Sequence, residues 1–136
     1  MECELCNALH QEFRIVCQDE LSFCVVVKWP LKPGHVMVLP KRHIASKKDL
    51  TEKEAKSLFD MIDKVVCAVE KAYKEDAIIH INTGNLRSQQ HLHIHIVPSK
   101  GDLRQHMALY VGVPERQDIS DAEKENMKDY IKNYLD

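Results

Sequence analysis

Three histidines at alternate positions carry the clearest chemical signal in this sequence: His91, His93 and His95. Side chains alternate across a β-strand with a period of two, so the three imidazoles would share one face and the apolar residues between them the other. A neutral imidazole is a nucleophile near pH 7, and an imidazolium can donate a proton or neutralise an anion. Such a row suits an anionic substrate that carries phosphate. The alternative is a row of half-exposed histidines without a role.

The length of the row limits how many of its members can bind one metal ion. A strand rises about 3.3 Å per residue, so the backbones of His91 and His95 lie roughly 13 Å apart. Zinc–nitrogen bonds measure about 2 Å, so neighbours can share an ion but all three on a regular strand cannot. A zinc module in which the whole triad serves the metal is therefore disfavoured, and at least one imidazole is expected to do other chemistry.

Strands and helices can be predicted around these residues. Alternating and β-branched patterns predict strands over residues 14–17, 21–28, 35–39, 77–82 and 91–97. Thr51 and Glu54 form a capping-box pattern at the start of a long helix with one apolar face. Ser120 and Glu123 repeat that pattern before a C-terminal helix. Several strands with two separate helices predict an α+β domain with an antiparallel sheet, although the pattern does not give the order of the strands.

Composition narrows the class of protein. The 136 residues correspond to one domain, residues 1–136. Lys and Arg number 19 against 21 Asp and Glu, so nothing favours bulk electrostatic binding to nucleic acid. No apolar run approaches the ~18 residues of a membrane span. The first residues lack the basic and apolar regions of a signal peptide, so we expect a cytoplasmic protein whose five cysteines are reduced or bind metal.

Three motifs resemble those of the histidine triad superfamily of nucleotide hydrolases and transferases. They are the Cys3-x-x-Cys6 pair, the segment Pro33-Gly-His-Val-Met-Val-Leu-Pro-Lys-Arg-His-Ile44, and His-x-His-x-His-x-x over residues 91–97. In order and spacing they cover residues 1–98, and residues 99–136 form a tail with a helix that matches no motif. The resemblance implies an antiparallel β-meander with one long central helix, a C-terminal helix and a homodimer.

The resemblance also implies an activity. His93 corresponds to a nucleophile that attacks an α-phosphorus and forms a nucleotidyl-histidine intermediate. His95 corresponds to a residue close to the transferring phosphoryl group and the leaving oxygen. Substrates of this kind are nucleoside phosphoramidates, adenylylated amines and dinucleoside polyphosphates. The alternative is a nucleotide-binding or interaction protein of the same fold with little turnover.

Similarity to the zinc-bearing microbial-type branch of the superfamily implies a structural zinc site with four ligands: Cys3, Cys6, His43 and His91. Two thiolates and two imidazoles form a closed set of the kind that structural zinc prefers. Two reduced surface thiols would explain the Cys-x-x-Cys pair equally well. The other cysteines are expected in the core: Cys17, Cys24 and Cys67.

Four further positions correspond to nucleotide- and phosphate-binding residues: Asn82, Arg87, Ser88 and His95. The alternative interpretation of Asn82 is a turn residue at the end of a strand. The alternative for Arg87 is a solvated loop residue. Val27 stands where many members of the superfamily place an acidic or amide residue that holds the ribose hydroxyls. Its apolar side chain cannot form those hydrogen bonds.

Overall fold

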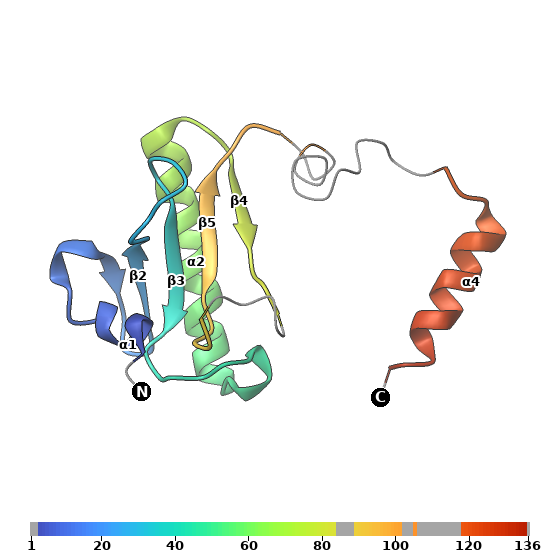
Figure 1. Ribbon diagram of the computed structural model, residues 1–136, viewed down its shortest axis with the longest axis horizontal. Coiled ribbons are helices and arrows are strands. Elements are labelled where there is room, and N and C mark those ends of the chain that lie inside the picture. Colours follow the sequence, from blue (N-terminus) through green and yellow to red (C-terminus); the bar gives the residue numbers. More distant parts are fainter. Residues whose placement is uncertain (1–2, 84–88, 102–104, 106–117, 136) are drawn as a thin grey trace. The chain divides into compact units, whose positions relative to one another are not determined.

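A computed structural model describes residues 3–83, 89–101, 105 and 118–135 of the chain. Contacts within the chain divide it into two units, Met1–Lys100 and Gly101–Asp136. Within the described part of the first unit lie two helices, two short 3-10 turns and five strands (Figure 1). The elements are α1 (Glu4–Ala8), η1 (Glu12–Arg14), β1 (Ile15–Gln18), β2 (Ser22–Val26), β3 (Val36–Pro40), η2 (Lys47–Asp49), α2 (Glu52–Tyr73), β4 (Ala77–His80) and β5 (Ile94–Pro98).

The five strands form one sheet in the order β1-β2-β3-β5-β4, and each neighbouring pair is antiparallel. The first three strands form a meander. Helix α2 then connects β3 to the far edge, and β5 returns to lie between β3 and β4. The predicted α+β class with an antiparallel sheet is therefore confirmed, and the structure adds the strand order.

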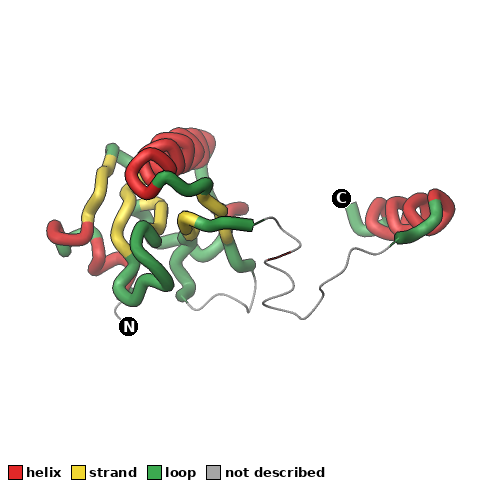
Figure 2. The backbone as a smooth tube through the Cα atoms, turned by 90° about the horizontal axis from the view of Figure 1, so that it is seen from above, coloured by secondary structure: helices red, strands yellow, loops and turns green. Residues whose placement is uncertain are grey.

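Helix α2 lies along one face of the sheet, as the two perpendicular views show (Figures 1 and 2). It begins where predicted: Thr51 and Glu54 form both hydrogen bonds of the capping box. The apolar residues between the triad histidines pack into the core beneath it, as the alternation predicted. That core is built from Cys24, Val36, Val38, Ile44, Leu58, Met61, Ile62, Val65, Val69, Leu92, Ile94 and Ile96.

The opposite face of the sheet is covered at one end by α1. A second apolar cluster holds this short helix in place and consists of Leu5, Ala8, Phe23, Val25, Met37 and Leu39. Because α1 covers only part of this face, the rest of the face is available to the triad histidines.

The strand that carries the triad is shorter than predicted. It begins at Ile94, so His91 and His93 precede it. The reason lies in the turn after β3: the Leu92 N–H donates to the carbonyl oxygen of Ile44, and the His91 ring donates to that of Pro40. These contacts pull the residues before Ile94 away from the regular ladder.

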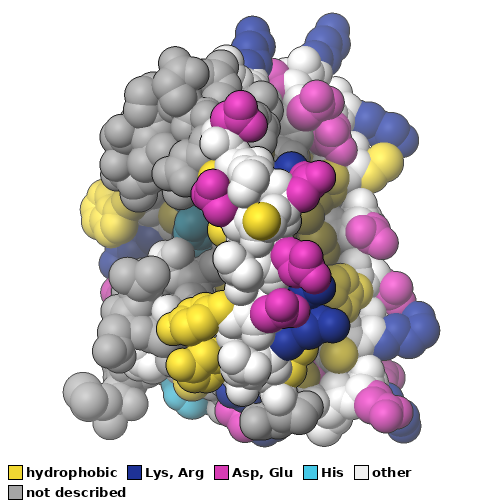
Figure 3. Space-filling model, turned by 90° about the vertical axis from the view of Figure 1, so that its right-hand side faces the viewer, with side chains coloured by type: hydrophobic (Ala, Val, Ile, Leu, Met, Phe, Trp, Pro, Cys, Tyr) yellow, Lys and Arg dark blue, Asp and Glu magenta, His cyan; other side chains and the backbone are white. Residues whose placement is uncertain are grey.

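Helix α4 (Asp121–Lys132) belongs to the second unit and begins at the predicted Ser120 cap. Its large apolar side chains, including Met127, Tyr130 and Ile131, are exposed. Figure 3 shows acidic and basic side chains intermixed among the described residues in view. Among the described residues, no helix combines the length and apolar character needed to cross a membrane.

Candidate active site

The four predicted metal ligands lie together. Cys3 caps the N-terminus of α1, Cys6 is in that helix, His43 follows β3, and His91 precedes β5. One ligand atom from each lies within 4.8 Å of all the others. The sulfur–nitrogen distances from Cys6 to the two rings are 3.4 Å, and that from Cys3 to His91 is 3.6 Å. Zinc–ligand bond lengths in a tetrahedral site place such atoms about 3.6 Å apart, so the group can hold a metal ion.

The His91 ring is fully buried and its orientation is fixed. Its Nε2 lies 2.8 Å from the carbonyl oxygen of Pro40, which can only accept, so Nε2 carries the hydrogen. The lone pair is therefore on Nδ1, which faces the sulfurs of Cys3 and Cys6. Burial lowers the pKa of His91 and favours the neutral form that a metal requires.

The loop that carries His43 is attached to the start of α2. The Arg42 guanidinium donates two hydrogen bonds to the buried Glu54 carboxylate, at 3.0 and 2.8 Å. Glu54 also accepts the N–H of Thr51 at the helix cap. The Arg42 hydrogen bonds, followed by the helix-cap hydrogen bond, hold the pKa of Glu54 down to about 2. Sequence patterns revealed the cap but not the arginine that shares its carboxylate.

The remaining cysteines do not all lie in the core. Cys24 is buried and Cys17 is half-buried, but Cys67 is exposed on α2, so its predicted position was wrong. Cys67 lies on the face of the helix that points away from the sheet.

His93 is nearly buried, with 8% of its surface exposed. Its Nδ1 lies 2.7 Å from the carbonyl oxygen of His91, so Nδ1 must donate the hydrogen. This leaves the lone pair of the neutral ring on Nε2. The backbone of one triad histidine thus selects the tautomer of the next.

His95 is oriented by a residue that the sequence did not single out for the site. The Leu31 N–H donates to Nδ1 of His35 at 3.1 Å, so the hydrogen of the neutral His35 ring is on Nε2. That Nε2 lies 2.9 Å from Nδ1 of His95 and donates to it. The His95 hydrogen is consequently on its Nε2. Backbone atoms cannot be read from residue types, which is why this chain of hydrogen bonds was missed.

His95 is also kept uncharged. Burial, followed by the charge interactions with His93, His35 and His80, lowers its pKa to about 4. The ring centroids of His93 and His95 are 5.0 Å apart. When both rings are neutral, the site therefore presents a lone pair on His93 and an N–H donor on His95, on adjacent rings.

The predicted phosphate-binding residues are only partly described. His80 of β4 is paired with His95 of β5, and their ring centroids are 6.2 Å apart. The His80 Nε2 donates to Oδ1 of Asn82 at 2.7 Å, which connects Asn82 to the triad side of the sheet. The predictions for Arg87 and Ser88 lie outside the described residues.

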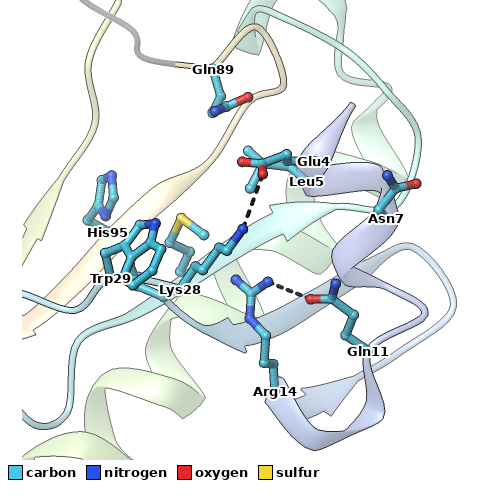
Figure 4. A pocket seen from close by; sticks show the side chains of 11 residues that line it. Glu4, Leu5, Asn7, Gln11, Arg14, Lys28, Trp29, Gln89 and His95 are labelled. Carbon is cyan, nitrogen blue, oxygen red and sulfur yellow. Dashed lines mark hydrogen bonds and ion pairs between the residues drawn. The ribbon is translucent and has the colours of Figure 1, made fainter. Parts of the chain in front are cut away.

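A cavity of about 290 Å³ opens beside His95 (Figure 4). Val27, Lys28 and Trp29 line it from the segment after β2. The N-terminal segment forms the facing wall, where Lys28 pairs with Glu4 at 3.4 Å. Val27 thus lies in a cavity adjoining the histidines, as its position in the sequence suggested.

Comparisons with known proteins find related sequences and similar structures. A family model described as HIT domain matches residues 9–102. A bis(5'-adenosyl)-triphosphatase of Dictyostelium discoideum is 38% identical over 68% of this chain and 64% of its own length. A bis(5'-nucleosyl)-tetraphosphatase (asymmetrical) of Schizosaccharomyces pombe is 37% identical over 64% of this chain and 50% of its own length. The chain thus spans less than two thirds of either relative.

A solved structure shares the fold. The crystal structure of a HIT family member from Bacillus subtilis superposes with a TM-score of 0.74. The alignment covers 100% of this chain and 99% of the other at 21% sequence identity.

Proposed function

Because this chain belongs to the HIT domain family, we propose that it hydrolyses nucleotides at an α-phosphorus through a nucleotidyl-histidine intermediate. Dinucleoside polyphosphates are the substrate class that best suits the site. The observation that carries the proposal is the pair of adjacent rings, His93 with a lone pair on Nε2 and His95 with a hydrogen on Nε2. The names of the two relatives, a triphosphatase and a tetraphosphatase, support the same class.

In the first step the lone pair of His93 Nε2 attacks the α-phosphorus in line. A phosphorus–nitrogen bond forms, the bond from phosphorus to the bridging oxygen breaks, and its electron pair leaves with the polyphosphate. The His95 N–H donates a hydrogen bond to that leaving oxygen. The His93 ring becomes positively charged, and the carbonyl oxygen of His91 stabilises this charge through the hydrogen on Nδ1.

In the second step water attacks the same phosphorus. The phosphorus–nitrogen bond breaks, its electron pair returns to His93, and a proton passes to solvent as the nucleoside monophosphate is released. Two displacements at one nucleophile replace a single attack by water on an unactivated substrate.

The neutral state of His95 favours polyphosphate leaving groups over amines. A neutral imidazole donates a hydrogen bond but does not readily give up a proton, and a polyphosphate oxygen leaves as an anion without one. An amine leaving group needs a proton. Nucleoside phosphoramidates and adenylylated amines are therefore the slower substrates in this proposal.

Structural zinc is the ion that we propose for the site formed by Cys3, Cys6, His43 and His91. Two sulfur and two nitrogen donors form a closed tetrahedral set that leaves no position for substrate. When bound, zinc would connect α1 to the two histidine-bearing segments and fix the His91 ring, whose carbonyl holds His93.

Asn82, Arg87 and Ser88 complete the proposal as phosphate-binding residues near His95. The hydrogen bond between His80 and Asn82 supports this role for Asn82. We further propose that residues 1–136 act as one histidine-triad domain in a cytoplasmic homodimer.

A second candidate function is a nucleotide-binding protein with little turnover. Val27 favours it, because an apolar side chain lines the cavity where a sugar hydroxyl would need a hydrogen-bond partner.

The test uses diadenosine tri- and tetraphosphate and an adenosine 5'-phosphoramidate, with release of AMP as the readout. We expect His93→Ala to lower turnover by about a thousandfold or more, and the exposed His10→Ala to leave it unchanged. Alkaline quenching and mass spectrometry should detect one nucleotidyl group on the wild-type protein and none on His93→Ala. Nucleotide binding without any product would instead establish the second candidate.

A further inference from the structure

Trp29 is the only tryptophan in the sequence, and 79% of its surface is exposed. Leaving a large aromatic ring in water forfeits the stabilisation that its burial would give. The residue lies between β2 and β3, and the Lys28 ammonium is 5.7 Å from its ring centroid. The indole contributes to the wall of the cavity beside His95 (Figure 4). Trp29 thus forms part of the cavity wall and does not pack in the hydrophobic core.

The cavity has room for one nucleoside. Its volume of about 290 Å³ lies at the lower end of the range for small-molecule sites, roughly 300–1,000 Å³. His95 and Trp29 line the same cavity. A nucleotide with its α-phosphorus at the histidines therefore places its own nucleoside in this cavity, and the other half of a dinucleoside substrate lies outside it.

The charged side chains of the cavity already have partners: Lys28 and Glu4 form an ion pair, and Arg14 donates to two neutral acceptors. Lys28 pairs with Glu4 at 3.4 Å. The Arg14 guanidinium donates to Oε1 of Gln11 at 2.7 Å and to the carbonyl oxygen of Val26 at 3.0 Å. The ion pair with Glu4 neutralises the Lys28 ammonium, which favours an uncharged occupant beside it, such as a base, over a second phosphate.

The polar groups that remain discriminate poorly between bases. Asn7 and Gln89 line the cavity, and each amide offers both a donor and an acceptor. Such groups can meet the edge of adenine or of guanine. Affinity for the base must then come mainly from contact with an aromatic face.

From these observations we propose that the indole of Trp29 is the platform on which the substrate's base stacks. Stacking strength grows with ring area, so the site selects purines over pyrimidines and distinguishes little between adenine and guanine. This inference rests on the proposed function, because it places the α-phosphorus at His93 and His95.

The test is a fluorescence titration with AMP, GMP, UMP and ribose 5-phosphate. Because the chain has one tryptophan, the signal reports Trp29 alone. We expect AMP and GMP to alter the fluorescence and to bind with dissociation constants within about threefold of each other. UMP should bind about five- to tenfold more weakly, and ribose 5-phosphate more weakly still.

Calorimetry extends the test to variants without the indole. Trp29→Ala should weaken AMP binding about tenfold and leave ribose 5-phosphate binding unchanged. Trp29→Phe keeps an aromatic face and should stay within about threefold of the wild type. Phe13→Ala is the matched control, since that ring is 87% exposed and does not line the cavity.

The outcomes separate this inference from the proposed function. Cleavage of diadenosine polyphosphates with the same KM and AMP affinity in Trp29→Ala and wild type overturns the inference alone. Equal affinity for AMP and ribose 5-phosphate does so too. A wild-type protein that neither binds AMP nor cleaves a nucleotide overturns both.

Discussion

Three histidines of one motif differ in chemistry because their ring nitrogens have different partners. The His91 ring donates to the carbonyl oxygen of Pro40 and keeps a lone pair for metal. The His93 ring donates to the carbonyl oxygen of His91 and keeps a lone pair on Nε2, the nucleophile of the proposed reaction. The His95 ring accepts from His35 and keeps a hydrogen to donate. At the residue scale, the backbone and one buried neighbour assign the roles.

His35 is a positioning residue, and its effect is testable. We expect His35→Leu to lower kcat by about ten- to a hundredfold with little change in KM, because His95 loses the donor that fixes its tautomer. His35→Gln should recover part of the rate, since its amide N–H can still donate. Equal impairment of both variants would show that the bulk of the ring, and not its N–H, matters.

The lowered pKa of His95 predicts a loss of stability in acid. Its folded pKa of about 4 lies below the ordinary 6.5, so the unfolded chain binds the proton first as the pH falls. We expect the free energy of unfolding to drop by about 2 kcal/mol from this group between pH 7.5 and pH 5. Urea unfolding of His95→Gln should show a flatter pH profile, and identical profiles would contradict the expectation. The metal ligands are common to both proteins.

The sequence predicted which residues form the site better than it predicted which ring nitrogens of the histidines carry the hydrogens. Alternation placed the apolar residues beside the triad in the core, and the resemblance to the zinc-bearing branch of the superfamily predicted that Cys3, Cys6, His43 and His91 lie together. The hydrogens on His93 and His95 depend on backbone atoms and on His35, which carry no pattern of their own. The exposure of Trp29 could not be predicted from the sequence either, because it depends on which surfaces the folded chain leaves in contact with solvent.

At the scale of elements, the proposed zinc site would join α1 to the segments before β5 and after β3. We expect Cys6→Ser to reduce bound zinc from one ion per chain to almost none and to lower activity about ten- to a hundredfold. Cys67→Ser is the matched control, because that thiol is exposed on α2. Elemental analysis with turnover measures both, and full activity in zinc-free Cys6→Ser would disprove the link.

The ion pair between Arg42 and Glu54 connects the loop bearing His43 to α2, and its removal should lower the stability of the protein. Glu54→Gln should lower the free energy of unfolding at pH 7 by about 2 kcal/mol, since Arg42 and the buried carboxylate lose their charged pair. The folded pKa is depressed, so this stability is present above pH 4.5 and is lost as the pH falls towards about 2. Denaturant unfolding at both pH values checks this, with the exposed Glu52→Gln as control. A difference that persists at pH 2 would argue against the ion pair.

Helix starts were predicted more accurately than strand ends. Both capping patterns mark the observed helix starts, because they depend on residues three positions apart. The triad strand was predicted from His91 but begins at Ile94. Contacts with Pro40 and Ile44, some fifty residues away in the chain, set that boundary, and a local pattern does not contain them.

At the scale of the first unit, the sheet separates a structural face under α2 from a chemical face beside α1. Gly34 is where the turn between β2 and β3 passes closest to both α2 and β5. Its φ is +93°, and a Cβ there would lie 2.6 Å from Pro98 and 2.9 Å from Tyr73. The close approach of these three elements depends on the absence of a side chain.

Gly34→Ala should therefore destabilise the unit by about 3 kcal/mol, through strain at positive φ and through the clash. A decrease of this size lowers Tm by roughly 10 °C. Calorimetric melting measures it, and Leu31→Ala in the same turn is the control because that side chain is 74% exposed. Equal melting temperatures for the two variants would contradict this account of the turn.

His91 links the two parts of the site, since its ring faces the thiols while its carbonyl oxygen receives the hydrogen of His93. A chelating compound would accordingly inhibit the protein without resembling a nucleotide and without entering the cavity. Inhibitor screens against this fold should include an arm with excess zinc, because restored turnover there would separate metal scavengers from compounds that compete with substrate.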